Sequence, residues 1–146
     1  MANTQLSDTI HVLVYIAYFH GQKMTSQEIA SSLETSPSLI RKIMATLKKT
    51  DLLAPTHGPK QLALARDPSE ITLRDIYRSL PGTSTLLNVD QHTSQSCPVG
   101  AVMPATLAHY YDEIQAAAEA QMAKITLQDV LNDVTLRQPS RGNQGR

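Results

Sequence analysis

At 146 residues the chain has room for one domain and one appended dimerisation element, which excludes a second, catalytic domain. Hydrophobic residues make up 41% of the sequence, but Trp is absent and Phe occurs once, so aliphatic side chains must fill the core of what we expect to be a mainly α protein. The net charge is zero, yet residues 1–66 carry seven Lys and Arg against four Asp and Glu, and residues 67–146 carry six against nine. A basic half beside an acidic half is expected when one half meets phosphate and the other meets protein.

The sequence contains neither a membrane span nor a recognisable targeting signal. No run approaches the roughly 20 apolar residues that cross a bilayer, and residues 1–6 lack the charged flank and apolar core of a secretory signal. Cys97 is the only cysteine, so an intrachain disulfide and an all-cysteine metal site are both impossible within one chain. We therefore expect a cytoplasmic protein with no metal and no cofactor.

Two helices are predicted in the first 33 residues. Apolar residues recur at helical spacing over residues 6–18. After Gly21, the pair Thr25 and Glu28 matches a capping box, in which hydroxyl and carboxylate satisfy each other's free backbone N–H groups. A second helix is therefore predicted from Thr25 to about Leu33.

A third helix is predicted from Ser36, an N-cap residue followed by Pro37 at the first helical position, to about Thr50. Its residues divide into two faces at helical spacing. The apolar face consists of Ile40, Ile43, Met44 and Leu47, and the polar, basic face consists of Ser38, Arg41, Lys42, Ala45, Lys48 and Lys49.

The next segment predicts a small two-stranded wing and a fourth helix. Residues 52–55 and 61–65 are short extended candidates, and residues 56–60 between them contain a Gly-Pro turn signal. Thr72 and Asp75 then cap a helix that ends near Leu80. Residues 1–80 are thus predicted to form a winged helix-turn-helix domain.

Residues 81–101 are predicted to be a loop or link, and a long helix is predicted over residues 102–125, with Pro104 near its start. At 1.5 Å per residue this helix is roughly 36 Å long, more than the winged domain can cover, so we expect its apolar stripe to dimerise. Thr126 and Asp129 cap a last short helix, and residues 102–135 complete the dimerisation segment before a disordered tail, 136–146. The stripe consists of Leu107, Tyr111, Ile114, Ala118, Met122 and Ile125.

Two short helices joined by a tight turn, the second basic on its free face, fit the major groove of DNA. The residues at the start of the third helix, Ser36, Ser38 and Arg41, are the candidates for reading base edges, with Lys42 near the groove rim. The alternative is an ordinary solvated helix face, which is the default for a charged outer surface. The candidates for phosphate contacts are Thr25, Ser26, Lys48, Lys49 and Lys60.

The most specific motif lies behind the wing, where residues 64–73 read Leu-Ala-Arg-Asp-Pro-Ser-Glu-Ile-Thr-Leu and are followed by Asp75 and Ile76. With this run, the segment 25–30 and the block 36–53, the chain resembles the Rrf-two family of bacterial winged-helix transcription regulators. The family includes the IscR, NsrR and CymR types, and the resemblance covers nearly the whole chain. The resemblance implies a homodimeric repressor or regulator whose long helices cross and whose winged domains each bind half of a palindromic site.

The sequence departs from the family pattern at two places. The family's wing usually carries Gly-Gly-Tyr, whereas residues 58–62 here read Gly-Pro-Lys-Gln-Leu, which weakens any expectation of a minor-groove contact. The iron-sulfur members hold their cluster with three cysteines before the long helix, but this chain keeps only Cys97, with Gln91 and Thr85 at the other two positions. One thiolate cannot hold a cluster, and residues 97–100 resemble the cluster-free YwnA-like subgroup instead.

Two interpretations of Cys97 stay open. Proximity to a helix start lowers the pKa of a thiol and would suit a redox sensor, whereas a small half-buried residue at the end of a loop needs no such role.

Two other functions compete with DNA binding. One is a winged-helix module that binds a protein through the third helix. The other is a small enzyme, which the sequence disfavours because it has no Gly-rich phosphate loop, catalytic carboxylate pair or Ser/His/Asp arrangement.

Overall fold

The computed structural model describes residues 4–55, 62–82 and 85–139. Within these ranges nearly all regular structure is helical, which confirms the predicted mainly α class. The elements are α1 (Gln5–Tyr18), α2 (Ser26–Leu33), α3 (Pro37–Lys49), the 3-10 turn η1 (Pro68–Glu70), α4 (Leu73–Ser79), α5 (Met103–Met122) and α6 (Leu127–Arg137).

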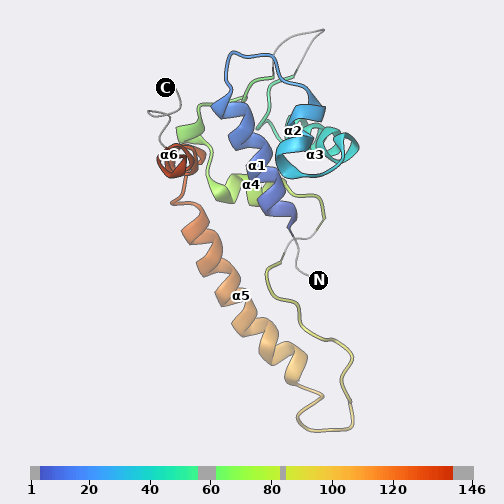
Figure 1. Ribbon diagram of the computed structural model, residues 1–146. Coiled ribbons are helices and arrows are strands. Elements are labelled where there is room, and N and C mark those ends of the chain that lie inside the picture. The colour runs from blue at the N-terminus through green and yellow to red at the C-terminus, as the bar shows by residue number, and fades with distance from the viewer. Residues whose placement is uncertain (1–3, 56–61, 83–84, 140–146) are drawn as a thin grey trace.

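Helix α1 is the centre of the body, with α2 and α3 on one side of it and α6 on the other (Figure 1). Its apolar side is fully enclosed, since Leu13 and Ile16 are at most 1% exposed. Each neighbouring helix adds buried aliphatic residues to the same cluster, as the composition requires when aromatic residues are scarce. These residues include Ile29 from α2, Ile40 and Leu47 from α3, Ile76 from α4 and Leu127 from α6.

The predicted wing is reduced to a minimal ribbon. The only bridge between its two arms within the described residues is antiparallel and joins Leu53 to Leu64. Two backbone hydrogen bonds flank it, from Ala54 N–H to the Ala63 carbonyl at 2.9 Å and from Ala65 N–H to the Leu52 carbonyl at 3.1 Å. The strands predicted over 52–55 and 61–65 are therefore reduced to one bridge in the described residues, because short Ala- and Leu-rich arms have weak strand propensity. The predicted turn, 56–60, and Gln61 lie outside the described residues.

Helix α4 begins with the predicted capping box. The Thr72 hydroxyl accepts a hydrogen bond from Asp75 N–H at 3.1 Å, and the Asp75 carboxylate accepts one from Thr72 N–H at 3.0 Å. The segment just before α4 also pairs with the segment that follows α5. Leu73 N–H donates to the Ile125 carbonyl at 2.9 Å, and Leu127 N–H donates to the Ile71 carbonyl at 2.7 Å.

This pairing shortens the long helix. We predicted it over residues 102–125, but α5 ends at Met122, because Ile125 and Thr126 are drawn into extended pairing with residues 71–73. Its 20 residues correspond to about 30 Å. Pro104 lies in the first turn, where a missing N–H costs nothing, so it causes no kink. Figure 1 shows α5 extending away from the body, with residues 85–102 running out to its far end.

Helix α6 returns to the body. Leu127 is fully buried in the main core, and Val130, Leu131 and Val134 pack against that core. The helix runs to Arg137, further than the short helix we predicted, and so takes up the first two residues of the predicted disordered tail. No helix among the described residues is both long and apolar enough to cross a membrane.

Candidate nucleic-acid interface

The turn between α2 and α3 is short and tightly closed. Glu34 ends α2 in the left-handed conformation, with φ 53°, and Thr35 N–H donates to the Ala30 carbonyl at 3.0 Å. Ser36 then caps α3, its hydroxyl accepting a hydrogen bond from Leu39 N–H at 3.2 Å. Ile29 and Ile40 belong to one core, so the two helices pack together as the predicted helix-turn-helix.

Only half of the predicted capping box at Thr25 is present. The Thr25 hydroxyl accepts a hydrogen bond from Glu28 N–H at 3.1 Å, as predicted. The Glu28 carboxylate, however, accepts from the Thr25 hydroxyl at 3.3 Å and makes no capping bond with Thr25 N–H. The first turn of α2 thus keeps backbone donors that an anion can use.

The outward face of α3 is polar and cationic. Ser36, Ser38, Arg41, Lys42 and Lys49 are exposed, and Lys48 is half-buried at the edge of the face. The helix contains no Asp or Glu, so its four cationic side chains are not neutralised from within the helix. The opposite face holds the buried residues Ile40, Met44 and Leu47, as the helical spacing predicted.

Two predicted contact residues from different helices meet in the structure. The Arg41 guanidinium on α3 donates to the Ser26 hydroxyl at the start of α2, with Nη1 3.5 Å from Oγ. This contact places a base-reading candidate beside a phosphate-contact candidate. Lys42 instead lines a groove of about 280 Å³ between α1, α3 and the end of α4, and Lys60 lies outside the described residues.

The loop before α5 does not offer an iron-sulfur donor set. Cys97 is its only thiol and is exposed, and no three His, Cys, Asp or Glu residues gather at one place in the part of the chain that is described. Backbone hydrogen bonds from Gly100 and Val99 lower the pKa of the Cys97 thiol. The residues present fit a reactive thiol and do not fit a cluster held by one chain.

A polar cluster that sequence reasoning missed joins α5 to α4. The Glu119 carboxylate accepts a hydrogen bond from Arg78 at 3.0 Å and lies 3.8 Å from Arg74 Nε, and both contacts help to lower its pKa. Gln115, one turn before Glu119, donates to the Tyr77 hydroxyl at 2.8 Å. Only the spacing of Gln115 and Glu119, four residues apart beside the apolar stripe, could have indicated a second contact face.

Comparisons with known proteins bear on the whole chain. A family model described as Rrf2, Iron-dependent Transcriptional regulator, matches residues 2–133. YwnA of Bacillus subtilis strain 168, named as a candidate HTH-type transcriptional regulator, is 33% identical over 132 residues, which are 90% of this chain and 98% of that protein.

Solved structures show the same fold. The crystal structure of a candidate DNA-binding protein matches with a TM-score of 0.70 at 31% identity, covering 87% of this chain and 98% of that one. T. potens IscR matches with a TM-score of 0.70 at 22% identity, covering 97% of this chain and 93% of that one. CymR, the global cysteine regulator of B. subtilis, matches with a TM-score of 0.65 at 18% identity, covering 91% of this chain and 97% of that one. This chain belongs to the Rrf2 family of transcriptional regulators.

Proposed function

We propose that this protein is a sequence-specific DNA-binding repressor that acts as a homodimer on a palindromic operator. The observation that carries the proposal is the outward face of α3, which presents four cationic side chains and no acidic one from a helix held by a tight turn. An α-helix with such a face fits the major groove, and its positive charge replaces counterions of the phosphate backbone.

The DNA contacts divide by position on the helices. Ser36, Ser38 and Arg41, at the start of α3, would meet base edges, and Arg41 can make two hydrogen bonds to a guanine. The residues further along α3 and at the start of α2 would meet phosphates and set the position of the helix without reading sequence. These phosphate contacts are assigned to Thr25, Ser26, Lys42, Lys48, Lys49 and Lys60.

The second copy is supported by an uneven distribution of exposed apolar side chains. Of nine large apolar residues that are exposed in the described part of the chain, seven lie between residues 86 and 114, on the loop and on α5 as far as Ile114. No residue of α5 is buried by its own chain. An apolar surface of this kind marks a protein interface. Five residues of the predicted stripe, Leu107, Tyr111, Ile114, Ala118 and Met122, lie on the same helix, whereas Ile125 lies beyond its end.

DNA binding is tested by fluorescence anisotropy with the promoter region upstream of the protein's own gene. Affinity should fall steeply as salt rises. Arg41→Ala should cost about 1 to 3 kcal/mol and relax the preference at one base position. Lys48→Ala should weaken all sequences alike and reduce the salt slope by about 1. A reporter driven by the same promoter should rise in activity when the protein is removed.

Lys124→Ala is the matched control, since Lys124 is an exposed cation outside the helix-turn-helix. It should leave both affinity and salt slope unchanged. If Arg41→Ala and Lys124→Ala bind DNA equally well, α3 does not read the operator. A complex with a protein that forms through α3 and is insensitive to salt would favour the competing function, a winged-helix interaction module.

A further inference from the structure

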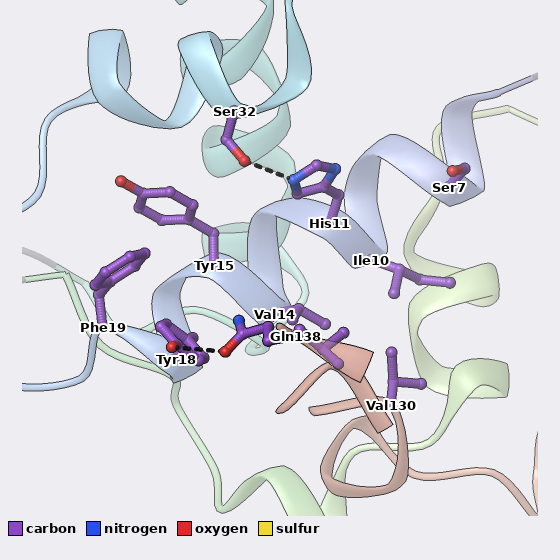
Figure 2. A pocket seen from close by; sticks show the side chains of 11 residues that line it. Ser7, Ile10, His11, Val14, Tyr15, Tyr18, Phe19, Ser32, Val130 and Gln138 are labelled. Atoms are coloured by element: carbon purple, nitrogen blue, oxygen red, sulfur yellow. Dashed lines mark hydrogen bonds between the residues drawn. The ribbon is translucent and has the colours of Figure 1, made fainter. Parts of the chain in front are cut away.

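A pocket of about 590 Å³ lies between α1, α2 and α6. We name it the α1–α6 pocket. Its size falls within the range of sites that hold small organic ligands. Figure 2 shows side chains from α1 and α6 on its walls, with Ser32 of α2 at one edge.

The pocket has an aromatic end. The Tyr15 and Phe19 ring centroids are 4.6 Å apart, and those of Tyr18 and Phe19 are 4.9 Å apart. Three of the chain's six Tyr and Phe residues therefore gather at the end of one helix and line one pocket. Such ring faces and edges favour a ligand that is itself aromatic.

The remaining wall is aliphatic, and hydrogen-bonding groups stand at two separate edges. Val14 on α1 and Val130 on α6 supply apolar surface. At one edge, His11 Nε2 lies 2.8 Å from the Ser32 hydroxyl, and at another the Tyr18 hydroxyl donates to Gln138 at 3.1 Å (Figure 2). Among the residues that the structure describes, no Lys, Arg, Asp or Glu lines the pocket, so these walls offer no fixed counter-charge to an ionised ligand.

The apolar side chains of this pocket are recessed. None of its lining residues is among the large apolar residues that are exposed on the described surface, whereas the loop and α5 contribute seven. A concave site with few polar groups suits a small molecule.

From these features we propose that the α1–α6 pocket binds a neutral aromatic small molecule and that this molecule is an effector of the regulator. The effector role rests on the proposed DNA binding. Ser32 belongs to α2 of the helix-turn-helix, and α6 follows the α5 helix that we assign to dimerisation, so a ligand here contacts both functional parts. Binding that differs between the DNA-bound and free protein must change DNA affinity by the same factor.

The direct test uses N-phenyl-1-naphthylamine, a neutral aromatic compound that becomes fluorescent in apolar surroundings, with the full chain and without DNA. The wild type should show saturable fluorescence. Val134→Phe adds bulk to the α6 wall and should weaken binding by about 10-fold or more. Asn132→Phe is the matched control, because it adds the same side chain to an exposed position of α6 that does not line the pocket.

If Val134→Phe loses its helical circular dichroism, Ser32→Leu at an exposed edge position replaces it and should weaken binding in the same direction. The proposal is overturned if the wild type gives no saturable signal, or if the pocket variant binds as well as the Asn132→Phe control. It is also overturned if the probe binds only to monomer at concentrations below dimerisation, because the pocket would then be a subunit interface.

A second titration, with the promoter DNA present, tests the effector role. The dissociation constant of the probe should change by about 5-fold or more when DNA is bound. Equal affinity with and without DNA refutes the effector role. Failure of the protein to bind any DNA refutes the proposed function instead, and leaves the pocket to be judged by the first titration.

Discussion

Truncation of one side chain on the apolar stripe should measure how far α5 drives dimerisation. Ile114 is 48% exposed in the single chain. Complete burial of an Ile side chain stabilises a folded or associated state by about 1.5 to 3 kcal/mol. A partner that covers the exposed half would therefore contribute about 0.7 to 1.4 kcal/mol for each copy. A twofold dimer counts this contribution twice, so Ile114→Ala should raise the dimer dissociation constant by about 10- to 100-fold.

Sedimentation velocity over a range of protein concentrations measures this constant. Asp112→Ala serves as the control, because Asp112 is an exposed residue two positions away on the other side of α5. Both substitutions introduce the best helix former, so a weaker dimer in Ile114→Ala alone cannot come from a weaker helix. A dissociation constant within about twofold of the wild type would show that the stripe is not the contact between copies.

Three further predictions follow from local geometry. Ser36→Ala removes the cap of α3 and should lower the free energy of unfolding by about 1 kcal/mol in a urea titration, whereas Ser36→Asp should restore it; equal stability of both variants would contradict the capping role. The pKa of Glu119 in the folded protein is lowered from 4.5. Ionised Glu119 therefore stabilises the fold fully above pH 4.5, and this stabilisation is lost as the pH falls through the lowered pKa. The unfolding temperature should therefore fall less between pH 6 and pH 3 for Glu119→Gln than for the wild type. An equal fall in both proteins would contradict this role of Glu119. Because the Cys97 pKa is lowered from 9.0, its rate of alkylation by iodoacetamide should reach half its maximum below pH 9, and a midpoint at or above that value would rule out thiolate stabilisation by the turn.

The sequence by itself determined the elements whose signals are local. The caps at Ser36, Thr72 and Thr126 each act through hydrogen bonds that span three residues, so the residue types alone placed the starts of α3, α4 and α6. The division of α3 into a buried and a cationic face likewise follows from helical periodicity. The helix-turn-helix and its candidate contact residues were therefore predictable without coordinates.

The tertiary structure alone decided the features that join distant segments. Helix α5 ends at Met122 because residues near 125 pair with residues near 72, and neither segment carries a signal for the other. Glu119 meets Arg78 across 41 positions, and Tyr18 meets Gln138 across 120, so the contact between α4 and α5 and the α1–α6 pocket have no sequence pattern. Periodicity states which face of a helix is buried, but the path of the chain decides what that face meets.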